Sequence, residues 1–320
     1  MLAPCFLFWI PGVERMKKYL FWRVMQIIPV LLLISMFVFG LLYMAGDPVA
    51  LMLPEDATQE QVDSLRASLG LDQPFYVQYF HFVGDLLRGD FGYSYRYNQP
   101  ALPIVLERLP ATFELAFSAM FVAIIMAIPL GIASATKRNT FLDIFISGGS
   151  VLGKAMPNFW LGIMLILMFA ITYPFFPVSG SGSFAHLILP AITLGTASAA
   201  EMTRVLRSSM LETLNQDYVR TAVSKGVRNT KVVNLHAFRN ALVPFITITF
   251  LQTSSLVSGA LITEVVFSWP GLGQLLIQAI NGRDMAIVQA SIFMVAFIVI
   301  AMNLFADILY RVLDPRIRYD

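Results

Sequence analysis

The 320-residue sequence contains few charged residues and very little cysteine or histidine. Charged side chains make up 13% of it, against roughly 25% in a soluble domain. The single Cys5 excludes an intramolecular disulfide and any metal site built from several cysteines, and the three histidines do not have the spacing of metal ligands. Paired carboxylates and the HExxH and GxSxG motifs are also missing. We therefore expect no catalytic residue and no metal ligand in this chain.

Long apolar stretches take up most of the sequence, which is 57% hydrophobic and has a mean hydropathy of +0.70. Each is close to the ~20 residues that cross a bilayer as a helix. The third contains Pro157, which should break it, and the fourth is only weakly apolar and rich in small residues. The fold class predicted is therefore an all-α integral membrane protein, surrounded by lipid, with six transmembrane helices. They are expected at 21–45, 113–136, 151–175, 187–205, 241–266 and 285–310.

The distribution of Lys and Arg predicts the orientation of these helices. Basic residues gather before the first span, in the loop 137–138, between the fourth and fifth spans, and at the C-terminus. Loops rich in Lys and Arg stay in the cytoplasm. Both termini and the segment 217–244 are therefore expected to be cytoplasmic, and the long loop after the first span to be extracytoplasmic.

These signals divide the chain into five parts. Residues 1–15 form an N-terminal extension, either a mis-called start or a loose tail, and 16–45 carry the first transmembrane helix. The extracytoplasmic loop is 46–112, and within it 59–69 is predicted to be a short amphipathic helix. The five-helix core is 113–311, with a polar loop at 212–244, and 312–320 form a cytoplasmic tail.

The segment 217–244 is polar and basic, although it lies between two apolar spans. Asp217 is predicted to cap a short helix, and Gly226 to end that helix in a left-handed conformation. Asn229 or Thr230 is expected to cap a second helix that continues into the fifth span. The apolar positions of the short helix form one stripe, Tyr218, Val219, Ala222 and Val223.

The triplet Arg220-Thr221-Ala222 with Gly226 four residues later resembles the cytoplasmic coupling loop of ABC-transporter permeases. Arg220 in place of Glu, and a Pro that follows the Gly by 18 residues, are departures that resemble the peptide/nickel branch of the family. Further stretches resemble that branch in order from about residue 16 to 319. They are Gly70-Leu-Asp-Gln-Pro74, Gly89-Asp-Phe-Gly92, Arg108-Leu-Pro-Ala-Thr112, Pro157-Asn-Phe-Trp-Leu-Gly162, Arg207-Ser-Ser-Met210 and Leu313-Asp-Pro-Arg316.

The resemblance implies a multi-pass permease subunit of an ATP-driven importer in the bacterial inner membrane. It implies four kinds of partner: a second, similar permease, two cytoplasmic ATPase subunits, an extracytoplasmic solute-binding protein and membrane lipid. ATP and Mg²⁺ would be bound by the ATPases, so that no cofactor is expected in this chain, and nucleic acid is not an expected partner. Di- or oligopeptides are the first choice of solute, while nickel chelates, glutathione and sugars stay open.

The resemblance also assigns residues to coupling. A short helix with an apolar stripe can sit in a groove on a partner, and ATP-driven movement of that partner would then rock the helix bundle. Tyr218, Val219, Ala222 and Gly226 would carry docking, and Arg220 and Lys225 would form charge pairs at its rim. The full set of coupling residues is Asp217, Tyr218, Val219, Arg220, Thr221, Ala222, Lys225 and Gly226.

The fifth span carries a group of polar residues: Gln252, Thr253, Ser255 and Ser258. They either pack helices together or line a translocation path, and both interpretations stay open. We expect no Asp, Glu, Lys or Arg deep in a span, which argues against an ion-coupled pump. The competing function is an ATP-independent channel or secondary transporter, for which 217–244 would be an ordinary basic loop.

Two further motifs have structural interpretations. Gly148, Gly153 and Lys154 match the opening of a Walker A loop, but Ala155 stands where Mg²⁺ needs Ser or Thr. Close-packing glycines with a snorkelling Lys154 are predicted instead. In the segment 264–273, Trp269 suits a membrane interface, and the resemblance suggests an outer-face element near the translocation gate.

Overall fold

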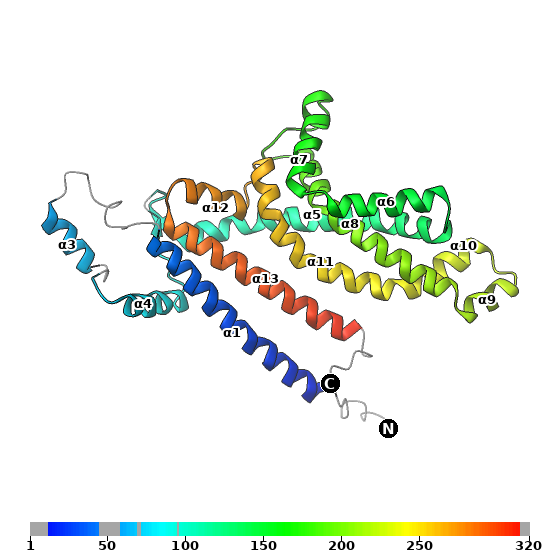
Figure 1. The fold of residues 1–320 in the computed structure, drawn as a ribbon, viewed down its shortest axis with the longest axis horizontal. Coiled ribbons are helices and arrows are strands. Elements are labelled where there is room, and N and C mark those ends of the chain that lie inside the picture. The colour runs from blue at the N-terminus through cyan, green and yellow to red at the C-terminus, as the bar shows by residue number, and fades with distance from the viewer. Residues whose placement is uncertain (1–11, 45–57, 69–71, 95, 314–320) are drawn as a thin grey trace, which may run out of the picture. The chain divides into compact units, whose positions relative to one another are not determined.

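The structure, a computed structural model, describes residues 12–44, 58–68, 72–94 and 96–313. Most of the extension 1–15, the first part of the loop 46–112, the start of the Gly70 motif and most of the tail lie outside the described residues. The chain divides into two compact units, Met1–Gly92 and Tyr93–Asp320, which are described separately. Both are mainly helical (Figure 1).

The first unit contains α1 (Gly12–Met44), α3 (Gln59–Ser68) and α4 (Phe75–Leu87). α3 confirms the predicted amphipathic helix at 59–69. The ring of Phe39 in α1 packs against aromatic rings of α4, and its centroid lies 5.0 Å from that of Phe75 and 5.5 Å from that of Tyr79. The hydroxyls of Ser35 and Tyr79 lie 2.8 Å apart. Part of the aromatic content of the predicted loop therefore packs on the first span.

The second unit contains a short hairpin followed by a series of helices. Strands β1 (Tyr93–Ser94) and β2 (Gln99–Pro100) pair antiparallel. The helices are α5 (Ala101–Thr136), α6 (Phe141–Ala155), α7 (Asn158–Ile166), α8 (Phe184–Leu214), α9 (Asp217–Ser224), α10 (Asn229–Lys231), α11 (Phe238–Phe267), α12 (Leu272–Asn281) and α13 (Met285–Leu313), with π-helical segments η1 (Leu167–Thr172) and η2 (Val232–Ala237) (Figure 1).

Within the described residues, four helical stretches are long and apolar enough to cross a membrane: Phe21–Gly40, Ala101–Thr136, Asn229–Phe267 and Met285–Leu309. α6 with α7 and η1 would make a fifth, bent by 104° where Pro157 precedes α7, so the predicted break in the third span is confirmed. α5 starts twelve residues before the expected 113, because Pro100 precedes its first turn and the residues after it are already apolar.

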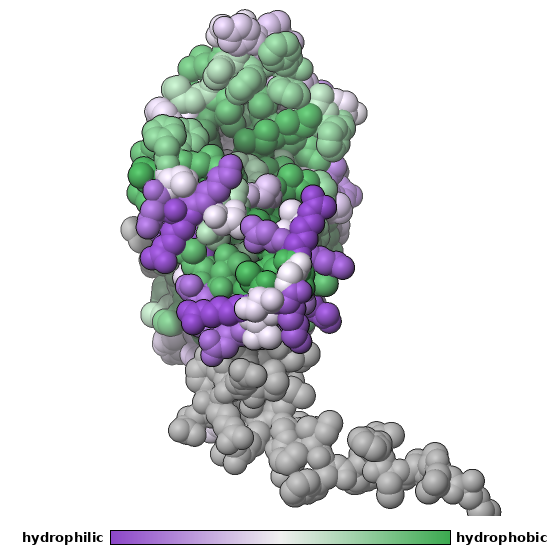
Figure 2. All heavy atoms as spheres, turned by 90° about the vertical axis from the view of Figure 1, so that its right-hand side faces the viewer, coloured by the Kyte–Doolittle hydropathy of each residue, from purple (hydrophilic) through white to green (hydrophobic). Residues whose placement is uncertain are grey.

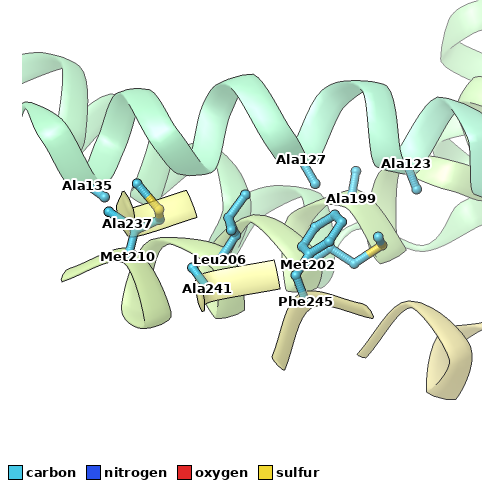
Figure 3. Packing of buried hydrophobic residues seen from close by; sticks show 10 residues of the cluster. All are labelled: Ala123, Ala127, Ala135, Ala199, Met202, Leu206, Met210, Ala237, Ala241 and Phe245. Carbon is cyan, nitrogen blue, oxygen red and sulfur yellow. The ribbon is translucent and has the colours of Figure 1, made fainter. Parts of the chain in front are cut away.

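The core of the second unit lies between α5, α8 and α11. A Cβ added at Gly195 of α8 would lie 2.5 Å from the backbone oxygen of Ala119 in α5, so the two helices touch through their backbones. In one cluster of this core, alanines of α5 pack against long side chains of α8 and against the start of α11 (Figure 3). Its buried members are Ala123, Ala127, Ala135, Ala199, Met202, Leu206, Met210, Ala237, Ala241 and Phe245.

Candidate functional site

The short helix α9 forms as predicted, but it begins at the expected cap, Asp217, one residue earlier than predicted. Asp217 is the first helical residue, and the capping position is held by Gln216, whose side chain makes no capping hydrogen bond. The Asp217 carboxylate lies 3.8 Å from the Arg220 guanidinium instead. The prediction that Asp217 caps the helix is therefore wrong, and so is the one for Asn229 or Thr230, since Arg228 precedes α10.

The C-terminal end of α9 confirms that Gly226 ends the helix in a left-handed conformation. This residue has φ +77°, in the left-handed region. Its N–H donates to the carbonyl of Val223 at 2.9 Å, and the N–H of Val227 donates to the carbonyl of Ala222 at 3.2 Å. These two bonds make a Schellman motif, which satisfies the last carbonyls of the helix. A Cβ at Gly226 would meet no atom within 4 Å, so only the backbone conformation demands glycine here.

The predicted apolar stripe of α9 is divided between two environments. Val219 is 3% exposed and Ala222 is half-buried, whereas Tyr218 is 43% exposed and Val223 is 56% exposed. The Tyr218 hydroxyl accepts a hydrogen bond from the Asn240 side chain at 2.6 Å. In this chain Val219 therefore anchors the helix, and the surface open to a partner is formed by Tyr218, Val223 and the polar residues beside them.

α9 contacts the core of the helix bundle through the π-helical segment η2. α9 packs against η2, and Ala237 at the end of η2 belongs to the core cluster that also contains Leu206 and Met210 of α8 (Figure 3). From Asn229 to Phe267 the chain is one continuous helical stretch. α9 is therefore connected to α8 through packed side chains and to α11 through the chain itself.

The end of the second unit that carries α9 and α10 is rich in hydrophilic side chains, which lie around a hydrophobic area (Figure 2). Arg220 and Lys225 are exposed, and their role at the rim of a docking surface stays a prediction. Beside them is an open groove of about 550 Å³, lined by Val227, Arg228, Thr230 and Lys231. This surface combines exposed apolar residues with basic ones.

A buried ion pair close to the α5–α6 turn was missed from the sequence. Asp143 of α6 is buried, and its carboxylate accepts two bonds from Arg207 of α8, from Nε at 2.7 Å and from Nη2 at 2.8 Å. The Ser134 hydroxyl and the Asn139 backbone N–H also donate to it, at 2.5 and 2.9 Å. Two features of the sequence could have indicated this pair: Asp143 is an isolated acidic residue at the start of an apolar stretch, and Arg207 belongs to the Arg207-Ser-Ser-Met210 motif.

The polar residues of the predicted translocation path differ in exposure. Gln252 is buried and Thr253 half-buried, and the Thr253 hydroxyl donates to the carbonyl of Thr249 at 3.2 Å. Ser255 and Ser258 are exposed on one face of α11, between Leu251 and Ile262. Packing accounts for the first two. A path-lining role stays a prediction for the two serines.

Lys154 forms an ion pair instead of snorkelling. Its Nζ lies 2.5 Å from Oε2 of Glu201, and the Gln252 side chain also interacts with this carboxylate. Glu201 lies near the middle of α8 and four residues from the end of the expected span 187–205, and the expectation that no charged residue lies deep in a span stays a prediction. Gly148 to Lys154 lie within helix α6 and form no loop. Gly153 packs against Thr196 and Ala200, whereas Gly148 faces open space, so close packing is right for only one glycine.

The start of α12 is built around a second buried acid. Glu264 is fully buried, and its carboxylate accepts the backbone N–H of Gly273 at 2.6 Å. The Thr112 hydroxyl accepts the N–H of Leu272 at 2.9 Å. Trp269 is buried and donates from its indole to the carbonyl of Ala111 at 2.8 Å, so the interpretation of Trp269 as an interfacial anchor is wrong.

Comparison with known proteins now decides the family. Residues 127–319 match the model of the binding-protein-dependent transport system inner membrane component, and residues 16–116 match the N-terminal model of the same membrane components. The chain belongs to this family. Its members are permease subunits of transport systems in the inner membrane, which agrees with the several apolar helices of this chain.

Relatives of this permease have names that state their cargo. The dipeptide transport system permease protein DppB of Escherichia coli K12 is 38% identical over 337 residues, which cover 95% of this chain and 99% of the relative. The protein of the same name from Alkalihalophilus pseudofirmus is also 38% identical, with 95% and 100% covered.

Solved structures show the same fold in other permeases. The structure of the MetNI methionine ABC transporter in inward-facing conformations matches with a TM-score of 0.55 at 16% identity, covering 66% of this chain and 96% of that chain. Among the described residues of the permease, no group of three or more His, Cys, Asp or Glu could hold a metal ion.

Proposed function

We propose that this permease is half of the translocation pathway of an ATP-driven importer of di- or oligopeptides, and that α9 is its coupling helix. The observation that carries the proposal is α9 itself. It is anchored inward by Val219, closed by the left-handed Gly226, and presents Tyr218 and Val223 outward among basic residues. A membrane protein exposes such apolar side chains beside charges where another protein docks.

The proposed membrane topology has six spans. Four are the apolar helical stretches, the fifth is the bent pair α6–α7, and the sixth is α8. α8 is too rich in small and polar residues to qualify by hydropathy, but its faces are largely buried by α5 and α11, so little of it would meet lipid. Both termini and α9 would be cytoplasmic, and residues 46–112 extracytoplasmic.

The partners proposed are a second permease of similar sequence, two cytoplasmic ATPase subunits and an extracytoplasmic solute-binding protein. The ATPases would bind ATP and Mg²⁺ and receive α9 in a groove. Their closure would push α9, and the packing of η2 on α8 would tilt the bundle between inward and outward access. Asp217, Arg220, Thr221 and Lys225 are exposed and would supply polar contacts around Tyr218.

Peptides are proposed as cargo because relatives 38% identical over nearly their whole length are named dipeptide permeases. In such a system the solute-binding protein would select most of the solute. The permease would need only a path that accepts the ends and the backbone of a short peptide.

Reconstitution in proteoliposomes tests the function. We expect uptake of a dipeptide only when the ATPases, ATP and the loaded binding protein are present. Dipeptide flux through this chain alone would identify it as a channel or secondary transporter. ATP-driven uptake of nickel or a sugar, but of no peptide, would keep the permease role and replace the cargo.

Thiol labelling tests the orientation in intact cells, in a Cys5→Ser background. Asp85→Cys and Ser181→Cys should react with an impermeant reagent, and Lys225→Cys should react only after the cells are opened. Labelling of Lys225→Cys in intact cells would overturn the topology.

A further inference from the structure

A charged and polar cluster lies where three helices of the second unit meet. Lys154 comes from the end of α6, Glu201 from the middle of α8 and Gln252 from α11. Lys154 Nζ and Glu201 Oε2 are 2.5 Å apart, and Gln252 interacts with the same carboxylate. Ser255 is exposed one turn further along α11. Lipid offers no partner to such groups, and ionisable residues in spans mostly face a cavity or another protein group.

The position of this cluster along the bundle follows from α8. Glu201 is six residues before Arg207, which lies beside the α5–α6 turn through its pair with Asp143. At about 1.5 Å per residue, Glu201 is therefore ~9 Å further into the bundle. The Lys154 side chain is 49% exposed there and that of Glu201 is 30% exposed. The pair is thus open on one side, in helices that would otherwise be surrounded by membrane.

We propose that the Lys154–Glu201 pair, with Ser255, is a contact site for zwitterionic solutes in the translocation path. The Lys154 ammonium has three donors, of which the pair uses one, so it can also bind a peptide carboxylate. The Glu201 carboxylate can accept from a peptide ammonium. A peptide with free ends carries both charges, and the pair offers the complement of both. This inference rests on the proposed function, since it concerns peptides on their way through the permease.

The first experiment measures how accessible the cluster is to charged reagents in water. In a Cys5→Ser background, Ser255→Cys is placed in the complete transporter and treated with small methanethiosulfonates of either charge. We expect reaction from water and slower reaction with the cationic reagent after Glu201→Gln, because the carboxylate raises the local cation concentration. A thiol that reacts with neither reagent, with and without ATP, would mean that lipid or the second permease covers the cluster, and would overturn the proposal.

The second experiment measures transport of radiolabelled alanyl-alanine by proteoliposomes with the full transporter and loaded binding protein. Glu201→Gln and Lys154→Met should lower the uptake rate about tenfold, the loss expected when one charge-assisted hydrogen bond is removed. ATP hydrolysis stimulated by the loaded binding protein should remain. The control is Glu114→Gln, an exposed carboxylate of α5 outside the cluster, which should transport normally.

The outcomes separate this proposal from the proposed function. A wild-type transporter that takes up no dipeptide would defeat the proposed function. Normal wild-type uptake with equal rates in Glu201→Gln and Glu114→Gln would overturn the contact site alone. Parallel loss of assembled complex and of stimulated ATP hydrolysis in Glu201→Gln would show that the pair only holds helices together, and would also overturn it.

Discussion

Two short helices adjoin the long helical stretch Asn229–Phe267, α9 before it and α12 after it, and they are held in opposite ways. In α12, Leu272, Gly273, Leu275 and Ala279 are buried, and its first N–H groups bind Thr112 and Glu264. In α9 the buried side chain is that of Val219, and no side chain caps its start.

The difference shows which short helix is held inside this permease and which one exposes most of its surface to solvent. α12 is held by hydrogen bonds and by the burial of its apolar side chains, so its residues contribute to the stability of the folded permease. α9 is fastened on one side, and its other side keeps apolar and basic groups in solvent. Substitutions in α12 should therefore reduce assembly, and substitutions in α9 should reduce coupling while the helices stay in place.

Gly273→Ala should give the largest effect of the four variants considered. The added Cβ would lie 2.5 Å from the Cα and carbonyl oxygen of Leu261, and backbone atoms cannot move aside as a flexible side chain can. We expect a loss of about 3 kcal/mol in stability, seen as a lower melting temperature of the purified transporter. Gly149→Ala in α6 is the control, since its Cβ meets open space. Equal melting temperatures for both would refute the close approach of α12 to α11.

Glu264→Ala should give the second largest effect. It removes the acceptor of the Gly273 N–H and leaves a void in a fully buried place. We expect destabilisation of about 2 kcal/mol, because a buried donor loses its partner. Glu264→Gln keeps one acceptor oxygen and should lose less. An Ala variant as stable as the wild type would show that α12 does not depend on this carboxylate.

Gly226→Val should leave the amount and melting temperature of the transporter unchanged and reduce coupling. A β-branched residue at φ +77° costs more than about 1 kcal/mol locally, which tilts α9 or opens its last turn. The measurements are dipeptide uptake and stimulated ATP hydrolysis at matched protein levels. Normal values for both would mean that Gly226 is only a permissive turn, and the coupling role would have to be assigned to other residues.

Arg220→Ala should give the smallest effect. The side chain is largely exposed, and its contact with Asp217 is long, at 3.8 Å. We expect ATPase association to weaken about threefold at low salt, with the difference disappearing at high salt as a rim charge is screened. Arg88→Ala, at an exposed arginine directly after α4, is the control and should show no change. A loss that persists at high salt would indicate a desolvated contact at Arg220.

The features that could be predicted from the sequence depend on local signals. Gly226 was identified because a left-handed helix end favours glycine, and the break at Pro157 because proline lacks an N–H donor. The start of α9 was predicted within one residue, from Asp217 as the expected cap, although Gln216 holds that position.

The features that were missed depend on contacts between residues far apart in the chain. Trp269 is a residue type common at membrane interfaces, and it is buried here because it packs in a cluster with residues of α5, α8 and α11 and donates to Ala111. From the sequence Lys154 was predicted to snorkel, because its partner Glu201 lies 47 positions later and only the fold brings the two together. The stripe of α9 was predicted correctly as apolar, but its division between core and surface depends on where η2 returns.

The bidentate pair of Arg207 and Asp143 limits how the bundle can move. Two parallel bonds hold the guanidinium and the carboxylate in a common plane, so a roll of α8 about its own axis would shear both bonds at once. A tilt that carries α6 along would strain neither of them. The motion that keeps this pair intact is a swing of α6 and α8 as one arm, and in the proposed mechanism a push on α9 would displace the far ends of these helices sideways.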